Sequence, residues 1–128
     1  MITALLFAAA LAVPPPVTGD FDHDGRPDRA ELVPAGEGYR LQVRLAARPQ
    51  APVVVDTTGE LEGFYFRLAR PGTITTWCGK ERALDRKAPC PRRTVRLRRD
   101  TLEFGFTEKA SAVAPWTGRG FEVIWISD

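Results

Sequence analysis

Apolar and polar residues alternate along much of this chain, and this pattern predicts β-strands. Residues 39–45 alternate strictly, which places Tyr39, Leu41, Val43 and Leu45 on one face of an extended segment. Two further segments show the same alternation and are expected to point these side chains inward: Phe64, Phe66 and Leu68 in one, and Leu102, Phe104 and Phe106 in the other. Such strands bury one face against a common core.

Turn residues separate the expected strands at intervals of about ten residues, for example Pro71-Gly72, Arg99-Asp100 and the segment 117–120. The expected strands are residues 39–45, 52–56, 64–68, 73–77, 94–98, 101–106, 111–116 and 121–126. No segment has a 3.6-residue apolar period, although residues 81–87 fit one short helical turn. The sequence therefore predicts an all-β fold: a single antiparallel β-sandwich or barrel-like domain of about eight or nine short strands.

The N-terminal segment differs from the rest of the chain, because residues 2–13 are apolar except for Thr3. This run is too short to span a bilayer comfortably, and it ends in Ala10-Leu11-Ala12, a cleavage-site pattern. We expect a signal peptide at 1–12, a proline-rich linker at 13–19 and a single β-domain at 20–128. The protein would then be exported, periplasmic or secreted, with no transmembrane anchor in the mature chain. No Lys or Arg precedes the run, and the alternative is a buried N-terminal helix.

Cys78 and Cys90 are the only two cysteines. In an exported chain two cysteines usually pair, and a bridge between them would contribute on the order of 3 kcal/mol. A redox pair or two metal ligands are the alternatives, but the spacing is far from C-x-x-C and no other soft ligand lies nearby in the sequence. We predict one structural disulfide.

The strongest chemical signal is the acidic segment 20–31. Acidic residues occupy loop positions 1, 3, 5, 9 and 12, and glycine occupies position 6. Alternate side chains of a tight loop converge on one point, glycine permits the sharp turn, and clustered carboxylates suit a hard divalent cation. We therefore predict a Ca²⁺ site, and the alternative is a solvated turn held by bonds from aspartate side chains to the backbone.

An EF-hand needs a helix on each side of this loop, but prolines 14–16 precede it and Pro34 and Gly36 follow closely. The segment 19–28 instead resembles the DxDxDGxxD calcium loop of FG-GAP/VCBS-type repeats, in which the loop leads into a β-strand. The resemblance implies as ligands Asp20, Asp22, Asp24, the carbonyl of Arg26, and Asp28. Glu31, at loop position 12, is a further candidate, although the resemblance makes it a strand residue. One copy of the repeat is present.

A second resemblance covers the C-terminal segment 114–128 and the sequence Thr76-Trp77-Cys78-Gly79-Lys80. The first looks like the terminal W-x-G-x-x-F hairpin of small exported proteins that also carry a DxDxDGxxD loop and a T-x-C-G-K-type cysteine. This resemblance implies architecture and export, and it implies no activity.

Basic residues concentrate between Cys78 and Arg99, where nine Lys and Arg against two acidic residues give a net charge of +7. The whole chain carries +2, so the remainder carries −5. This cationic lobe is a candidate surface for an anionic cell-envelope component or an acidic protein, and the alternative is a solvated strand edge and loop. The candidate residues are Lys80, Arg82, Arg86, Lys87, Arg92, Arg93, Arg96 and Arg98.

Catalytic motifs are mostly absent from the sequence. The single histidine, His23, lies inside the acidic loop and is expected to face solvent, and there is no P-loop, G-x-G-x-x-G motif or zinc-ligand cluster. We expect a monomeric, non-enzymatic protein without nucleic-acid partners, since no nucleic-acid-binding signature occurs. A small metal-dependent hydrolase, in which the bound ion is catalytic, is the alternative.

Overall fold

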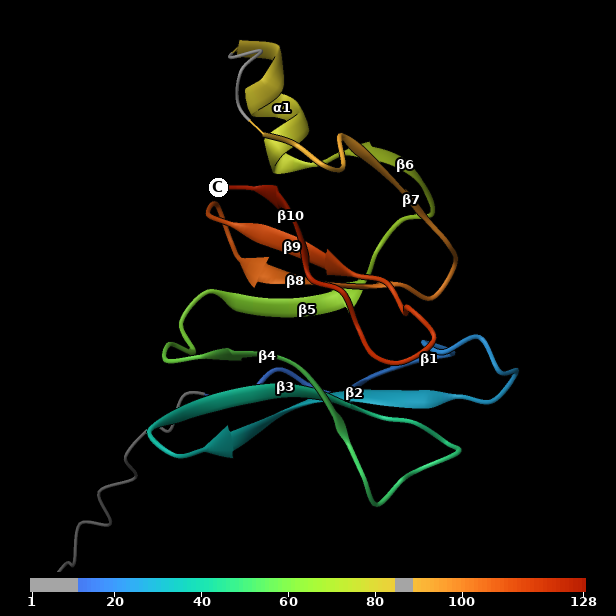
Figure 1. Ribbon diagram of the computed structural model, residues 1–128. Helices are drawn as coiled ribbons and strands as arrows, with labels where there is room; N and C mark the ends of the chain where they lie inside the picture. The colour runs from blue at the N-terminus through green and yellow to red at the C-terminus, as the bar shows by residue number, and fades with distance from the viewer. Residues whose placement is uncertain (1–11, 85–88) are drawn as a thin grey trace, which may run out of the picture.

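Two four-stranded antiparallel sheets stack face to face in the computed structural model, which describes residues 12–84 and 89–128 (Figure 1). A two-stranded hairpin and a short helix form a third layer, on the other side of the second sheet (Figure 1). The three layers do not follow one another in chain order. The strands β6 and β7 of the third layer lie between β5 and β8 in the sequence, although β5 and β8 are paired neighbours in the second sheet.

The first sheet is a meander in which each strand pairs with the next one along the chain. Its strands are β1 (Val17–Gly19), β2 (Asp28–Ala35), β3 (Gly38–Arg44) and β4 (Val53–Thr58). A two-residue turn joins β2 to β3, and its first residue, Gly36, has a φ of +59°. A glycine adopts this left-handed conformation without steric cost, so the sequence fixes the register that pairs Ala35 with Gly38.

The second sheet lies in the middle of the molecule and has the strand order β10-β9-β8-β5. Its strands are β5 (Phe64–Leu68), β8 (Leu102–Phe106), β9 (Ser111–Ala114) and β10 (Ile124–Ser127). Gly105 in β8 has a φ of +156°, and a Cβ atom there would lie 2.4 Å from the carbonyl oxygen of Ala110. Only glycine fits this close approach of β8 to the chain entering β9.

The third layer consists of β6 (Gly72–Thr75), β7 (Thr94–Leu97) and α1 (Trp77–Leu84). The Thr76 hydroxyl caps the helix by accepting a hydrogen bond from the Gly79 backbone amide at 3.1 Å. The same hydroxyl donates to the Arg92 carbonyl at 2.6 Å, which ties the helix to the segment before β7. The disulfide between Cys78 and Cys90 joins the same two segments and confirms the predicted pairing.

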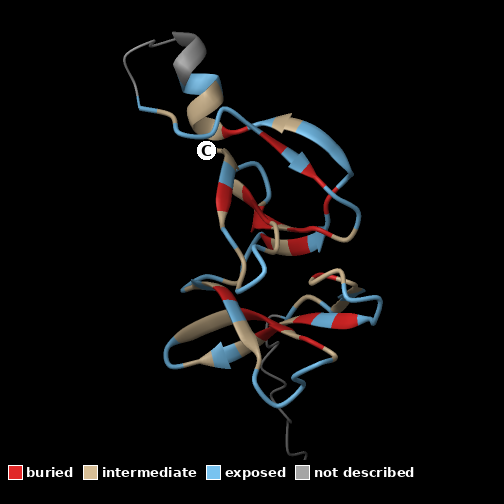
Figure 2. Ribbon diagram, turned by 45° about the vertical axis from the view of Figure 1, so that its right-hand side comes forward, coloured by how far each residue is buried: buried red, intermediate tan, exposed pale blue. Residues whose placement is uncertain are grey.

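The main core lies between the two large sheets, and strands of both sheets carry buried residues (Figure 2). Most of these residues have aromatic or branched aliphatic side chains. Its largest fully buried side chains are Phe21, Phe104, Leu41, Leu102 and Val43. Phe21 comes from the acidic loop and is 1% exposed, so this loop is anchored in the core by its second residue.

A smaller core lies between the middle sheet and the β6–β7 hairpin. It contains Ala69, Val95, Leu97, Val113 and Ile124. As a result β9 is buried on both faces, with Ala112 in the main core and Val113 in the smaller one. Alternation alone does not predict this, because a strand covered on both faces has apolar residues at successive positions.

The all-β class, the antiparallel pairing and the disulfide were predicted correctly, and the sheets are open and do not close into a barrel. The described residues form ten strands instead of eight or nine. One of the additional strands, β1, lies within the segment 13–19 that we expected to be a linker. It pairs with β2, so the described sheet begins at Val17.

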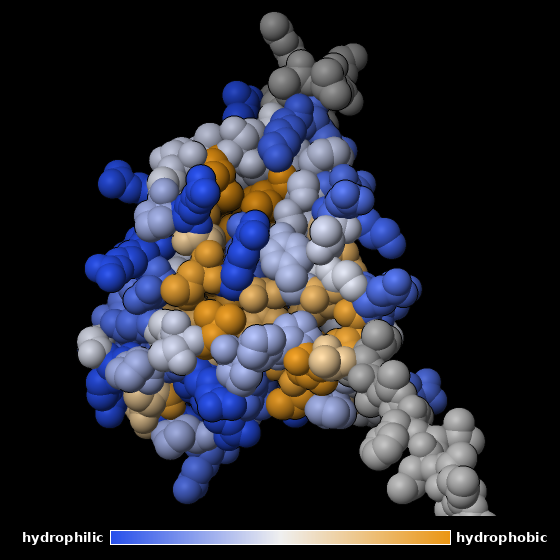
Figure 3. Space-filling view, turned by 180° about the vertical axis from the view of Figure 1, so that it is seen from behind, coloured by the Kyte–Doolittle hydropathy of each residue, from blue (hydrophilic) through white to orange (hydrophobic). Residues whose placement is uncertain are grey.

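Two local predictions were wrong. Trp77 was expected to end a strand; instead α1 already begins there because Thr76 caps it. The helical turn expected at 81–87 is confirmed for residues 81–84, and residues 85–88 lie outside the described residues. Leu68 was expected to point inward but is 41% exposed, because it lies at the end of the edge strand β5. Hydrophobic residues also reach the surface on the back face of the molecule (Figure 3).

Candidate metal centre and the basic surface beside it

The loop between β1 and β2 brings four aspartates together. Asp20, Asp22, Asp24 and Asp28 each offer a carboxylate oxygen, and these four oxygens lie within 4.8 Å of one another. The loop turns sharply at two left-handed residues, His23 with a φ of +58° and Gly25 with a φ of +88°. The side chains that the DxDxDGxxD spacing selected therefore converge on one point.

Backbone amides hold this loop in shape. The two oxygens of Asp20 accept from the amides of Asp24 at 3.1 Å and Gly25 at 2.9 Å, and Asp24 accepts from Arg26 at 2.9 Å. The Arg26 carbonyl, the expected main-chain ligand, accepts no hydrogen bond from any residue in 12–84 or 89–128. A carboxylate or carbonyl oxygen has two lone pairs, so these amide bonds leave acceptor capacity for a cation.

Asp28 is the buried member of the cluster and is 2% exposed. One of its oxygens accepts from the Phe21 amide at 2.8 Å and, more weakly, from the Asp22 amide at 3.4 Å. Its other oxygen accepts from the Ala46 amide, which follows β3, at 2.8 Å. Asp28 thus fastens both the acidic loop and the end of β3, so a ligand at this position is held rigidly by the sheet.

The carboxylates perturb one another's protonation. Burial, followed by repulsion from Asp28 and Asp24, raises the pKa of Asp22 from 3.8 to about 6. The pKa of Asp24 is lowered instead, first by the hydrogen bond from the Arg26 backbone amide. A bound cation would relieve the repulsion around Asp22. In chemical terms, the cluster is an all-oxygen, acidic site that can hold a hard metal ion.

Glu31 lies outside this cluster. It is a residue of β2, and its carboxylate accepts from Arg44 at 2.6 Å and from Gln42 at 2.9 Å on the neighbouring strand. The hydrogen bond from Gln42, together with that from Arg44, lowers the pKa of Glu31. Glu31 is therefore a strand residue paired across to β3, and it does not belong to the aspartate cluster.

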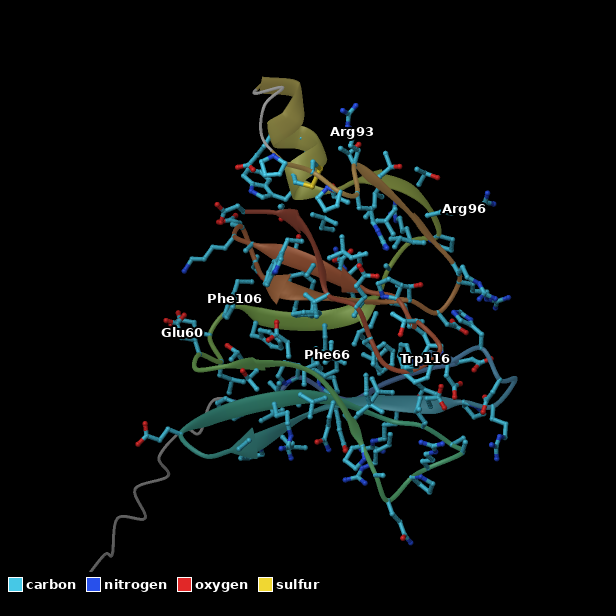
Figure 4. All side chains as sticks on the ribbon, viewed as in Figure 1. Glu60, Phe66, Arg93, Arg96, Phe106 and Trp116 are labelled. Carbon is cyan, nitrogen blue, oxygen red and sulfur yellow. A yellow bond between two sulfur atoms is a disulfide. The ribbon has the colours of Figure 1, made fainter. Side chains whose placement is uncertain are left out.

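The structure divides the predicted cationic lobe into parts. Lys80 on α1 donates to the Ile126 carbonyl, and Arg82 also lies on α1. Arg93 and Arg96 extend from different parts of the segment around β7 (Figure 4). Arg86 and Lys87 lie outside the described residues.

The arginines at positions 92, 96 and 98 line a common cavity of about 510 Å³. The opposite walls come from His23 of the acidic loop and from the connection between β9 and β10, which contributes Trp116 and Glu122. The sequence analysis named the arginines but did not place His23, Trp116 and Glu122 beside them. His23 was expected only to face solvent, and the packing that joins three distant segments has no local sequence signal.

Comparisons with protein-family models, with curated proteins and with solved structures found no match. Within the described residues, the one helix is too short to cross a membrane. The candidate function therefore rests on the acidic cluster and the basic cavity themselves.

Proposed function

We propose that this chain is an exported calcium-binding β-domain that acts as a non-enzymatic binding or accessory protein. In this proposal, Ca²⁺ stabilises the β1–β2 loop, and the basic surface around β7 binds an anionic cell-envelope component or an acidic protein. The observation that carries the proposal is the convergence of four aspartate carboxylates within 4.8 Å, on a loop whose spacing resembles the FG-GAP/VCBS calcium loop.

Calcium is favoured over magnesium by the kind of ligands offered. The proposed set is the side chains of Asp20, Asp22, Asp24 and Asp28 with the Arg26 carbonyl. Ca²⁺ accepts six to eight oxygen ligands in a flexible arrangement, whereas Mg²⁺ demands near-ideal octahedral geometry and usually keeps several waters. A loop that supplies many oxygens, one of them from the main chain, fits Ca²⁺ better than Mg²⁺.

A structural role for the ion fits its position better than a catalytic one. The loop is anchored by Phe21 in the main core and by Asp28 in the first sheet, so an ion bound there would stabilise the connection between β1 and β2. A catalytic ion needs an open coordination position and a general base beside it. The proposed ligand set instead surrounds the ion with nearly all the oxygens that it requires.

Export is supported by two features that are independent of the metal. The apolar segment at 1–12 with its Ala-x-Ala ending is typical of a signal peptide. The disulfide between Cys78 and Cys90 is typical of oxidising compartments. Extracellular calcium modules bind with dissociation constants of about 10⁻⁴–10⁻³ M, so the ambient calcium outside a cell would occupy such a site in part.

The test is a thermal melt of the purified, oxidised protein in EDTA and in a calcium titration. With a dissociation constant of about 10⁻⁴–10⁻³ M, 1 mM calcium adds about 0.4–1.4 kcal/mol to the free energy of unfolding. For a domain of this size, that corresponds to a rise in Tm of about 2–6 °C. The rise should vanish in the double variant Asp22→Ala/Asp24→Ala.

Glu31→Gln is the matched control, because it removes a carboxylate from the strand that follows the loop without changing the cluster. It should keep the full response to calcium, even if its Tm in EDTA is lower. An unchanged Tm for the unmodified protein at several millimolar calcium would exclude the metal assignment. The acidic loop would then be a turn held by hydrogen bonds between its aspartate side chains and backbone amides.

A further inference from the structure

The cavity beside the acidic loop has the composition of a ligand site for an acidic sugar. It lies where the loop after β1, the strand β7 and the β9–β10 connection meet, and it has a volume of about 510 Å³. This is within the range of about 300–1,000 Å³ found for small-molecule sites. A concave site of this size accepts a protruding chemical group, whereas a flat basic face suits a membrane surface.

The charge of the cavity is positive and only partly neutralised. Glu122, the acidic side chain in its wall, forms an ion pair with Arg92 at 3.2 Å. Arg96 and Arg98 form no ion pair with a carboxylate in the described part of the chain, and both are exposed. The site therefore retains two cationic side chains for an incoming anion.

Arg96 and Arg98 are placed to act together. Arg96 lies in β7 and Arg98 directly follows the strand. Exposed and buried residues alternate through position 98, so the two arginines lie on the same face, about 7 Å apart along the chain. Val95 and Leu97, on the opposite face, are buried in the smaller core and fix the orientation of the strand. A guanidinium is a planar donor that binds a carboxylate through two parallel hydrogen bonds.

The remaining walls supply an aromatic surface and hydroxyl groups. Trp116 is half-buried and packs edge-to-face on Phe121, with ring centroids 5.0 Å apart. Thr94 and Thr117 lie in the same lining. A rigid aromatic ring beside polar donors recognises a ligand that has both a nonpolar ring face and hydroxyl groups, and a sugar ring has both.

We infer that this cavity binds a carboxylate-bearing sugar unit of an acidic polysaccharide, with Arg96 and Arg98 on the carboxylate and Trp116 against the ring. The inference rests on the proposed function, because it specifies which anionic partner the basic surface takes. His23 forms part of the wall, and the Asp20 amide donates to the Asp100 side chain, at the turn after β7, at 3.2 Å. The acidic loop therefore contacts the cavity through His23 and is hydrogen-bonded to the turn that follows β7.

The experiment is isothermal titration calorimetry of the oxidised protein in 1 mM calcium with tetragalacturonate, and with its methyl ester as an uncharged control ligand. Binding of tetragalacturonate and not of the ester is expected. The double variant Arg96→Gln/Arg98→Gln should weaken the affinity about tenfold or more, since hydrogen bonds to a charged group are lost. Trp116→Phe, which keeps the contact with Phe121, should weaken it several-fold.

The double variant Arg93→Gln/Arg99→Gln is the matched control, because it removes the same charge from residues that do not line this cavity. It should keep the affinity within about threefold. Equal losses in the two double variants would overturn the inference, since binding would then follow net charge alone. A failure of the unmodified protein to bind tetragalacturonate would also overturn the inference.

Vesicles containing anionic phospholipid provide the remaining arm. Salt-sensitive binding of vesicles, without binding of tetragalacturonate, would overturn the sugar assignment and leave the proposed anionic partner standing as a lipid surface. The calcium melt is a separate measurement, so failure of the metal proposal is seen independently of the result with the sugar.

Discussion

Replacing Asp28 with alanine is expected to destabilise the protein strongly even when no metal ion is bound. Asp28 is 2% exposed, and its two oxygens accept short hydrogen bonds at 2.8 Å from the amides of Phe21 and Ala46. Hydrogen bonds to a charged group contribute about 1.5–3 kcal/mol each, so losing two costs about 3–6 kcal/mol. Relief of the repulsion between Asp28 and Asp22 offsets part of this cost, so the expected loss is about 3 kcal/mol.

The assay is urea denaturation in EDTA, followed by circular dichroism. A domain of this size has a total free energy of unfolding of about 5–15 kcal/mol, so the alanine variant can lie close to the limit of folding. Asp28→Asn keeps one acceptor oxygen in nearly the same shape and is expected to lose less. Asp24→Asn, at an exposed position of the same loop, is expected to change the stability in EDTA least of the three.

A free energy of unfolding for Asp28→Ala within about 0.5 kcal/mol of the unmodified protein in EDTA would refute this reasoning, because that is the range of ordinary surface substitutions. Asp28 would then have no structural role in the metal-free protein. A large loss in EDTA, together with an abolished calcium response, would establish that the residue both anchors the sheet and binds the ion.

Two further predictions concern pH and the disulfide. The pKa of Asp22 is raised from 3.8 to about 6 in the folded protein, so protonation of Asp22 stabilises the folded state. The free energy of unfolding of the metal-free protein should therefore fall as the pH rises from about 4 through 6. A series of Tm measurements against pH in EDTA should show this fall, and Asp22→Asn should remove it. A Tm profile that is the same in both proteins would contradict the assigned repulsion. Replacing Cys78 and Cys90 with serine should lower the free energy of unfolding by about 3 kcal/mol in urea denaturation. The rise in Tm with calcium should remain. Loss of the calcium response would show that calcium binding by the acidic loop depends on the third layer.

The sequence was most informative where one local pattern decides the structure. Leu41 and Val43, at alternate positions of β3, are buried as expected, and the turn at 117–120 is closed by a hydrogen bond from the Thr117 amide to the Gly120 carbonyl. The aspartates of the acidic loop converge because glycine and the spacing of the side chains determine the turn. These features depend on neighbouring residues, so a single sequence contains the information.

Features that depend on distant segments were not predicted. The sequence does not show that β9 is covered on both faces. It also does not show that β7 and β8, which flank the turn at Arg99-Asp100, pair with other strands and not with each other. Phe21 was not expected in the core, since its neighbours are charged. The walls of the basic cavity were missed for the same reason, because three segments far apart in the chain form them.

The most direct test of the central claim is the stoichiometry and selectivity of metal binding. Isothermal titration calorimetry of the oxidised protein with calcium and with magnesium should show one calcium bound per chain, with weaker binding of magnesium. Asp22→Asn/Asp24→Asn should bind neither ion, and Glu31→Gln should bind calcium as the unmodified protein does. Absence of calcium binding at several millimolar, or equal binding by the double variant, would contradict the assignment of the acidic loop as a calcium site.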